Sequence, residues 1–434
     1  MEMSELLSIF NKYSIDRTYI DDIVFDIDKI KRNTVYILIK KDDLKKYKKV
    51  LKRNPLYIIS AYENYGDLYV ENLKEYLSII FIKYYDIDFS KIKLIAITGT
   101  EMKSSLAKLL FDIYRQNNIK TLLISASFEG EDIYHSSLTT PPSNEMLKII
   151  KYAVTNNYKN IIYEASSIGI NEGRLNEIIP NELILTNLNV DHLDYHKTIT
   201  SYYESKKKYV LLAEKVYAYK NEIIKFNDNI DFIDINKVDE KEENKFVNFS
   251  YLQKSMIPYL LTYTKNNDLI IDYNNLFYPE GRIEILNKNP LVMIDYAHTF
   301  ASFKKVCSYF STLIKGKKVI VFGLGGNRDR SKRKPIGEIA SSYFDKVILT
   351  EDNSRNERFK NIVNDVIKDN INDFIVIKNR KKAIKFAFKN LSNDDGILII
   401  GKGVEKNIIR KHRIIKHSDK DLAIKLINRM KEIW

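Results

Sequence analysis

A chain of 434 residues exceeds what one hydrophobic core usually supports, so its length predicts roughly three domains. Hydrophobic residues at 44% and charged residues at 29% exclude a disordered chain, a collagen and a coiled-coil rod, and the single cysteine, Cys307, excludes a disulfide framework. The 70 basic and 57 acidic residues leave a net charge of +13, but the lysines are scattered instead of forming one basic stripe, so we expect no nucleic-acid partner.

Residues 1–88 alternate short β-like runs with lysine-rich helical stretches, which predicts a small α/β domain. The β-like runs are Thr34–Ile39 and Leu56–Ser60. The N-terminus lacks the basic and apolar regions of a secretory signal, and no apolar run reaches the roughly 18 residues of a membrane span. Together with the cysteine content, this pattern favours a cytoplasmic protein without a membrane span.

A strand–loop–helix–strand unit begins with the apolar run Ile92–Ile97. A helix-patterned segment follows it, and further strands are expected at Thr121–Ser125, Asn160–Tyr163 and Leu183–Thr186. This pattern predicts a mostly parallel sheet in a central domain, residues 89–281. Functional residues are expected at the carboxyl ends of its strands.

A second alternation of strands and helices follows and predicts a doubly wound, Rossmann-like domain over residues 282–434. The expected helices include Ala301–Ile314 and Lys381–Leu391. The expected strands are Leu291–Asp295, Lys318–Phe322, Lys346–Thr350, Phe374–Ile377 and Gly396–Ile400. The fold class is therefore α/β in three domains, with a P-loop-type sheet domain at the centre.

The segment TGTEMKSS, Thr98–Ser105, joins a strand to a helix, where backbone N–H groups and the helix dipole can bind phosphate. Lys103 would reach the β- and γ-phosphates, and Ser104 would place its hydroxyl on Mg²⁺. The usual P-loop pattern is incomplete, because Met102 occupies the position of its second glycine. An ordinary strand-to-helix turn is the alternative interpretation.

Further motifs follow this loop in order. They are YEASSIGINEGR (163–174), TNLNVDHLDYHKT (186–198), VMIDYAHTF (292–300), FGLGGNRDRSKRKPIGEIA (322–340), EDNSRNE (351–357) and IGKGVE (400–405). Together with TGTEMKSS they resemble the motifs of the Mur ligases, ATP-dependent enzymes that add amino acids to the UDP-linked cell-wall precursor. The combination is most similar to the branch that adds the third amino acid.

The resemblance implies a ligase of peptidoglycan synthesis that uses an acyl-phosphate intermediate. Its substrates would be ATP, UDP-MurNAc-L-Ala-D-Glu, which reacts at the D-Glu γ-carboxylate, and a free amino acid. Residues 1–88 would hold the uridine end of the precursor, residues 89–281 ATP, and residues 282–434 the amino acid. We expect a monomer whose third domain closes at the GRIE segment, residues 281–284, to complete the site.

The resemblance also assigns site residues. The ATP contacts would be Gly99, Thr100, Lys103, Ser104, Ser105, Asp295 and His298. The precursor contacts would be Thr139, Thr140, Ser166, Glu172 and Arg174. The amino-acid contacts would be Arg328, Asp352, Asn353, Arg355, Gly401 and Glu405.

Lys103 and two Mg²⁺ ions would neutralise the phosphates and the substrate carboxylate. Ser104 and Glu164 would bind one ion through oxygen. His192 would bind the second ion together with Lys206, which lies 14 residues after His192 and would carry a CO₂-derived carbamate, as in the family. A carbamate is an anion, whereas an unmodified ammonium would repel Mg²⁺.

The identity of the amino acid depends on Arg355 and Glu405. A guanidinium can pair with the distal carboxylate of meso-diaminopimelate while Glu405 accepts from its distal ammonium, which favours the diacid over lysine. Ser354 replaces the family's proline and is expected to loosen this turn. Glu101 and Met102 depart from the family's phosphate loop. The alternatives are therefore a lysine-adding ligase, a ligase with a folate, polyglutamate or pseudomurein-type acceptor, and a non-catalytic homologue that binds precursor and ATP.

Overall fold

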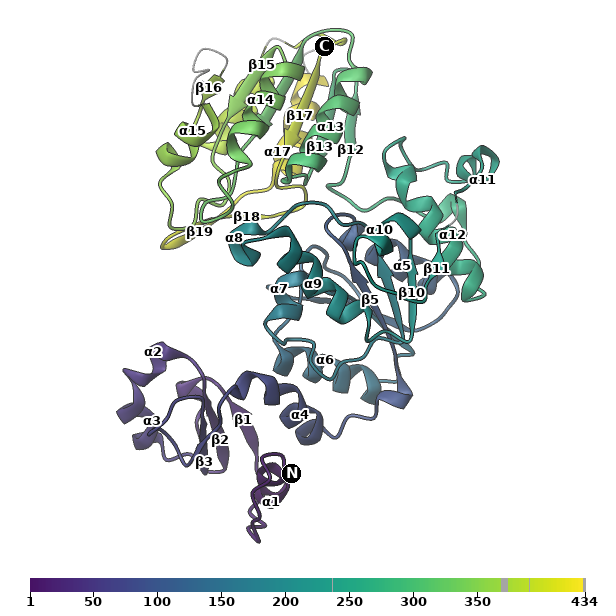
Figure 1. Ribbon diagram of the computed structural model, residues 1–434. Coiled ribbons are helices and arrows are strands. Elements are labelled where there is room, and N and C mark those ends of the chain that lie inside the picture. The colour runs from purple at the N-terminus through teal and green to yellow at the C-terminus, as the bar shows by residue number, and fades with distance from the viewer. Residues whose placement is uncertain (236, 368–373, 390, 432–434) are drawn as a thin grey trace. The chain divides into compact units, whose positions relative to one another are not determined.

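The computed structural model describes residues 1–235, 237–367, 374–389 and 391–431 (Figure 1). The chain divides into two compact units. One comprises residues 1–98, 119–184 and 205–216, and the other comprises residues 99–118, 185–204 and 217–434. The expected α/β fold class is confirmed: the described residues form sheets of four, seven and six strands with helices between the strands, and a two-stranded hairpin. The domain limits at residues 88 and 281 stay predictions, because the two units divide the chain at other positions.

The N-terminal sheet is parallel, with the order β1-β2-β3-β4. Its strands are β1 (Asp22–Val24), β2 (Thr34–Leu38), β3 (Tyr57–Ser60) and β4 (Leu68–Tyr69), and its helices are α1 (Met3–Ser8), α2 (Lys41–Leu44), α3 (Tyr47–Arg53) and α4 (Leu73–Tyr85). The two strands expected in this region are present to within one residue. Tyr36, Leu38 and Ile58 pack with Val50 of α3 in its core.

The second sheet has seven strands in the order β11-β10-β9-β5-β8-β6-β7. They are β5 (Lys93–Thr98), β6 (Thr121–Ser125), β7 (Ile133–His135), β8 (Asn160–Glu164), β9 (Glu182–Leu185), β10 (Lys215–Ala218) and β11 (Ile233–Asp234). The pairs β5–β8, β6–β8 and β6–β7 are parallel, as the βαβ pattern predicts. Every residue of β5 after Lys93 is buried, which explains its uninterrupted apolar run.

The helices of this region include α5 (Lys103–Gln116), which buries Leu106, Leu109, Leu110 and Ile113 along one face. The others are α6 (Ser143–Thr155), α7 (Ser167–Asn171), α8 (Leu193–His196), α9 (Ile199–Val210), α10 (Lys220–Ile224), α11 (Glu240–Asn244) and α12 (Ile257–Asn266). Short 3₁₀ turns occur at Ile27–Lys29, Phe89–Lys91, Gln253–Met256 and Tyr273–Asn275.

The third sheet has six strands in the order β12-β13-β17-β14-β15-β16. They are β12 (Glu284–Lys288), β13 (Leu291–Asp295), β14 (Lys318–Phe322), β15 (Lys346–Leu349), β16 (Phe374–Val376) and β17 (Gly396–Ile400). All neighbours are parallel except β12, which is antiparallel to β13. The sequence pattern missed β12, because this strand lies at the edge of the sheet and none of its residues is buried.

Helices cover both faces of the third sheet, so the expected doubly wound fold is confirmed (Figure 1). One core contains side chains of α13 (Phe300–Leu313), α14 (Arg333–Tyr343) and α15 (Phe359–Ile367). The opposite core contains side chains of α16 (Arg380–Ala387) and α17 (Asp419–Lys431). An antiparallel hairpin, β18 (Asn407–Arg410) and β19 (Arg413–Lys416), precedes α17.

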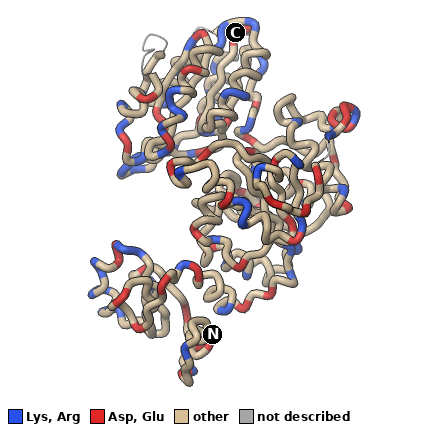
Figure 2. The backbone as a smooth tube through the Cα atoms, in the orientation of Figure 1, with Lys and Arg blue, Asp and Glu red and all other residues tan. Residues whose placement is uncertain are grey.

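Basic and acidic segments are scattered over the whole tube in Figure 2. This distribution agrees with the scattered lysines of the sequence. Among the helices that the structure describes, none combines the length and the apolar character needed to cross a bilayer.

Candidate functional site

The loop Gly99–Met102 connects β5 to α5 and has the backbone conformation of a tight turn. Gly99 has φ +135°, and a Cβ atom there would lie 1.9 Å from Oγ1 of Thr186, so only glycine fits. Met102 has φ +70° at the N-terminal cap of α5. Met102 thus adopts the left-handed backbone conformation at the position where the P-loop pattern has glycine. This conformation is unfavourable for a residue with a side chain, whereas glycine adopts it freely.

Contacts from the segment Thr186–Asn189 hold this loop. The backbone N–H of Thr100 donates to the carbonyl of Asn187 over 2.8 Å, and the N–H of Glu101 donates to the side-chain oxygen of Asn187 over 2.9 Å. Thr186 Oγ1 donates to the carbonyl of Glu101 over 2.7 Å, and the N–H of Asn189 donates to Oγ1 of Thr100 over 2.9 Å. These bonds involve loop backbone and Thr100, and they do not require asparagine and glycine at positions 101 and 102.

Lys103 lies at the first position of α5. Its Nζ donates to the carbonyls of Gly99 and Thr100, each over 3.0 Å. The structure therefore brings the expected residues Gly99, Thr100 and Lys103 together, with Ser104 and Ser105 in the first turn of α5. The ammonium lies against the loop, and its contact with phosphate stays a prediction.

The two unusual loop residues each have a partner. Thr299 Oγ1, at the N-terminal cap of α13, donates to Oε1 of Glu101 over 2.7 Å. Ser255 Oγ donates to Sδ of Met102 over 3.8 Å. The carboxylate of Glu101 is thus held by a hydroxyl donor.

The expected metal ligands come from separate elements. Glu164 ends β8 and is only 2% exposed. Lys206, Lys207 and Lys208 are consecutive on α9, but Lys206 is 1% exposed whereas Lys208 is exposed, so the three lysines do not all face solvent. Burial of Lys206 agrees with a specialised role, since buried lysines need compensation for their charge.

His192 is the N-terminal cap of α8, with φ +54°, and its Nε2 lies 3.4 Å from Oδ2 of Asp191. Burial alone would raise the pKa of Asp191, but the charges of His192, Lys332 and His298 hold this pKa below its usual value. His192 therefore has a carboxylate that can orient its ring.

The oxygen donors of Ser104 and Glu164 have the chemistry that Mg²⁺ prefers. Within the described part of the chain, no group of three or more His, Cys, Asp or Glu side chains forms a metal site by itself. Mg²⁺ ligation and carbamylation of Lys206 stay predictions.

The residues expected to contact the precursor converge at the end of β8. Thr140 Oγ1 donates to the carbonyl of Glu164 over 2.8 Å and lies 2.8 Å from Oγ of Ser166, which caps α7. Arg174 donates from Nη1 to the carbonyl of Thr140 over 2.8 Å and from Nε to Glu172 over 2.9 Å. Glu172, where the family can carry glutamine, therefore partly neutralises Arg174. Thr139 precedes this cluster and is half-buried.

Asp295 and His298, the ATP contacts expected after β13, differ in their surroundings. Asp295 is buried, and its two oxygens accept from the backbone N–H groups of Ala297 over 2.6 Å and Ile283 over 2.8 Å. Asp295 thus fixes the GRIE segment, and burial raises its pKa above the ordinary value. His298 is exposed, and its Nδ1 lies 3.1 Å from the carbonyl of Tyr296.

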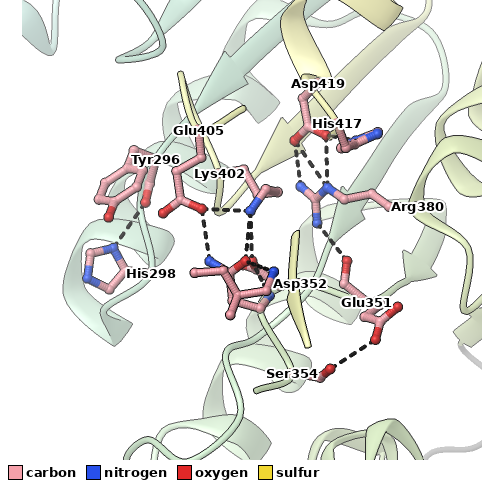
Figure 3. A network of polar contacts seen from close by, with 12 residues as sticks. Tyr296, His298, Glu351, Asp352, Ser354, Arg380, Lys402, Glu405, His417 and Asp419 are labelled. Atoms are coloured by element: carbon pink, nitrogen blue, oxygen red, sulfur yellow. Dashed lines mark hydrogen bonds and ion pairs between the residues drawn. The ribbon is translucent and has the colours of Figure 1, made fainter. Parts of the chain in front are cut away.

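A network of charged residues lies at the carboxyl ends of β15 and β17 (Figure 3). We call Asp352, Asn353, Lys402 and Glu405 the amino-acid cluster. Lys402 Nζ lies 2.6 Å from Oε2 of Glu405 and 3.2 Å from Oδ1 of Asp352. Asn353 Nδ2 also donates to Oε2 of Glu405, over 2.9 Å. The structure thereby unites the EDNSRNE and IGKGVE motifs, as expected.

Arg328 and Arg355 flank the same glycine beside this cluster. A Cβ atom at Gly325 would lie 3.0 Å from Nη1 of Arg355 and 3.6 Å from Cγ of Arg328. Burial lowers the pKa of Arg355, and the like charge of Arg328 lowers it further. Arg328 is exposed, and its charge lies close enough to act on Arg355, so the two like charges favour an anionic ligand group here.

Ser354 ties its turn instead of loosening it, which corrects the expectation from the sequence. The side chain is buried, and Oγ donates to Oε1 of Glu351 over 2.9 Å. Arg410 of β18 donates from Nε to the same carboxylate over 3.0 Å. The backbone N–H of Arg355 donates to the carbonyl of Ile409 over 3.0 Å, so the hairpin supports this turn. A proline at position 354 has no hydroxyl to bind Glu351.

Arg380 contacts the backbone at the carboxyl ends of β15 and β17. Its guanidinium pairs with Asp419 (Nη2–Oδ2 2.7 Å, Nε–Oδ1 2.9 Å), and both side chains are buried. Nη2 also donates to the carbonyl of Ile400 over 3.1 Å, one residue before Gly401. His417 Nε2 lies 2.7 Å from Oδ1 of Asp419.

Sequence reasoning missed Asn187, Arg380 and Lys402. Lys402 had a visible signal, since it stands between two glycines in IGKGVE. Asn187 lies in a quoted motif but was not singled out. Arg380 begins an unremarkable basic helix, and its burial depends on Asp419, which lies 39 residues away in the sequence.

Comparisons with known proteins agree with this architecture. A family model described as the Mur ligase middle domain matches residues 97–285, and one described as the Mur ligase glutamate ligase domain matches residues 281–403. The UDP-N-acetylmuramoyl-L-alanyl-D-glutamate–2,6-diaminopimelate ligase of Helicobacter pylori (strain J99) is 31% identical over 403 residues, which cover 83% of this chain and 89% of that relative.

Two solved structures show the same fold. A UDP-N-acetylmuramoyl-L-alanyl-D-glutamate–2,6-diaminopimelate ligase superposes with a TM-score of 0.60 at 19% identity, covering 99% of this chain and 100% of the other. MurF ligase from Thermotoga maritima, in complex with ADP, gives a TM-score of 0.55 at 13% identity, covering 95% and 97% of the two chains. With its motifs, its fold and its relatives in agreement, the chain belongs to the Mur ligase family.

Proposed function

We propose that this chain is an ATP-dependent ligase that joins 2,6-diaminopimelate to the D-Glu γ-carboxylate of UDP-MurNAc-L-Ala-D-Glu during peptidoglycan synthesis. The observation that carries the choice of amino acid is the arrangement of Arg328 and Arg355 beside the amino-acid cluster. The name of the relative from Helicobacter pylori supports the same substrate.

A diamino diacid has a distal carboxylate and a distal ammonium. The guanidinium of Arg355 would bind the carboxylate, and Glu405 would accept from the ammonium. Lysine would pair with Glu405 but would offer no carboxylate to Arg328 and Arg355. Arg328 is exposed and Arg355 is half-buried, and Arg355 Nη1 already donates to the carbonyls of Gly326 and Asn353. The preference for the diacid therefore comes from the charge pairing that a distal carboxylate adds.

Activation of the precursor requires ATP, because a free carboxylate does not react with an amine in water. Lys103 would contact the terminal phosphates, and the N–H groups at the start of α5 would support them. Thr140, Ser166 and Arg174 would hold the precursor close to the end of β8. The phosphate-loop geometry supports a working nucleotide site despite Glu101 and Met102.

Two Mg²⁺ ions would neutralise the phosphates and the acyl phosphate when bound. Ser104 and Glu164 would hold one ion, and His192 would hold the other with a carbamate on Lys206. The buried position of Lys206 on α9 supports this assignment, because a carbamate would place an anion there that can bind Mg²⁺, whereas an ammonium would repel the ion. Intact-mass measurement in bicarbonate buffer tests for the modification.

Phosphate release tests the proposed function directly. Purified protein with ATP, Mg²⁺ and UDP-MurNAc-L-Ala-D-Glu should release phosphate only when meso-diaminopimelate is added. Lys103→Ala should abolish release, whereas Lys108→Ala, one turn further along α5, should retain it. Release with lysine alone would contradict the substrate assignment. Stoichiometric ATP binding without phosphate release for any amino acid would instead support a non-catalytic homologue. Glu101 and Met102 in the phosphate loop are the reason to consider this alternative.

A further inference from the structure

We propose that Lys402 is a buried specificity-determining residue, which acts through Glu405 and Asp352 to favour a diamino diacid over lysine. This inference rests on the proposed function, because it concerns the same amino-acid site. Lys402 is a positioning residue in this account and need not contact the substrate.

The side chain of Lys402 is completely buried, with 0% exposure, whereas that of Glu405 is 34% exposed. Its Nζ contacts Glu405 over 2.6 Å and Asp352 over 3.2 Å, and it donates to Oδ1 of Asn353 over 3.4 Å. A buried ammonium is strongly unfavourable unless anions compensate for its charge. The two carboxylates are therefore its counter-ions, and they are fixed by it in turn.

The backbone around Lys402 leaves this side chain little freedom. Gly401 has φ +111°, and its N–H donates to the carbonyl of Asp295 over 2.9 Å. A Cβ atom at Gly403 would lie 2.7 Å from the carbonyl oxygen of Gly281. Lys402 thus stands between two closely packed glycines, and the direction of its side chain is set by the end of β17.

Glu405 is held so that one oxygen faces its protein partners. Lys402 and Asn353 both donate to Oε2, and the amide oxygen of Asn353 accepts from the N–H of Ile409 over 2.9 Å. Figure 3 shows the contact between Lys402 and Glu405. In the described part of the chain, Oε1 accepts no hydrogen bond. Oε1 is therefore the oxygen that can receive a ligand ammonium.

Lys402 also sets the charge that a ligand meets. Asp352 and Glu405 carry two negative charges, and Lys402 cancels one of them. The remaining negative charge matches one distal ammonium, while Arg328 and Arg355 match a distal carboxylate. Without Lys402, the doubly negative pair would attract a cationic side chain more strongly and would repel a distal carboxylate. The lysine therefore lowers the preference for a monocationic amino acid.

The test compares kcat/KM for meso-diaminopimelate and for L-lysine, measured by phosphate release. Lys402→Met keeps an unbranched apolar side chain in the buried space. Its ratio of diaminopimelate to lysine should fall at least tenfold relative to the unmodified chain, while KM for ATP changes less than twofold. Lys411→Met is the matched control. It removes an exposed charge from the turn between β18 and β19 and should leave the ratio unchanged.

Asp352→Asn is the second variant and should change the ratio in the opposite direction. It removes one of the two negative charges around Lys402, so that Lys402 and Glu405 together are neutral. The ratio of kcat/KM for diaminopimelate to that for lysine should therefore rise. If Lys402→Met does not fold, as judged by circular dichroism, Asp352→Asn alone decides: a ratio that stays constant or falls contradicts the inference.

A proportional loss with both amino acids in folded Lys402→Met would show a purely structural lysine and overturn the inference. Failure of the proposed function gives a different result: the unmodified chain releases no phosphate in response to diaminopimelate. This result is obtained before any variant of Lys402 is measured, so the two failures are distinguishable.

Discussion

The phosphate loop and the amino-acid cluster are held by different kinds of interaction. Most contacts that fix the loop Gly99–Met102 involve backbone groups, with Thr186, Asn187 and Asn189 supplying the partners. In the amino-acid cluster, charged side chains of Lys402, Glu405 and Asp352 hold one another. The difference explains why the loop accommodates two unusual side chains, whereas the cluster depends on the identity of each residue.

The largest expected effect is on the free energy of unfolding, at the buried ion pair of Arg380 and Asp419 beside the amino-acid cluster. Asp419→Asn leaves Arg380 as a buried, uncompensated cation, which should lower the free energy of unfolding by about 3–5 kcal/mol. Urea unfolding measures this loss, and Asp421→Asn, at an exposed position of α17, is the matched control. Equal stabilities of the two variants would contradict the dependence of this region on paired charges.

Acid should lower the free energy of unfolding through Glu357, which pairs with the buried Arg333 of α14. Hydrogen bonding from Arg333 lowers the pKa of Glu357 to about 2, against the opposing effect of burial. The unfolded state therefore binds the proton more readily, so this stabilisation is complete above pH ~4.5 and is lost as pH falls towards 2. It amounts to about 3 kcal/mol.

Urea unfolding of the unmodified chain and of Glu357→Gln between pH 7 and pH 3 tests this titration. The difference between them should be largest at neutral pH and should shrink as pH falls. A constant difference would show that the carboxylate contributes by packing alone.

Gly99→Ala tests the backbone side of the comparison. The added methyl group would overlap with Oγ1 of Thr186, so KM for ATP should rise at least tenfold and the free energy of unfolding should fall by about 2 kcal/mol. Gly130→Ala is the control, because Gly130 also has positive φ but the nearest atom to its Cβ position is 3.6 Å away. Similar effects of both substitutions would mean that crowding by Thr186 is unimportant.

The smallest effect is expected at Met102. Met102→Gly removes the cost of a left-handed methionine but increases the freedom of the unfolded chain, so stability should change by less than about 1 kcal/mol. Activity should not fall, and KM for ATP should fall or stay constant. Met102→Ala keeps the Cβ atom and should be the less stable of the two. A large loss of activity in Met102→Gly would show that the methionine itself contributes to the loop.

Much of the fold could be predicted because the buried parallel strands are uninterrupted apolar runs, as at Leu291–Asp295 and Gly396–Ile400. The edge strand β12 lacks this pattern and was missed. The motifs EDNSRNE and IGKGVE predicted that Asp352 and Glu405 belong to one site, and the two residues lie together around Lys402. Lys402 and Arg380 were not found, since their roles arise from charges that become neighbours only after folding, and the same holds for the bond between Ser354 and Glu351.

The central claim is that this ligase adds the diamino diacid, and a competition experiment tests it most directly. The protein is incubated with ATP, Mg²⁺, UDP-MurNAc-L-Ala-D-Glu and equal concentrations of meso-diaminopimelate and L-lysine, and the UDP-linked product is identified by mass. The arrangement of Arg328, Arg355 and Glu405 predicts a product that carries diaminopimelate. A product that carries mainly lysine would contradict the account.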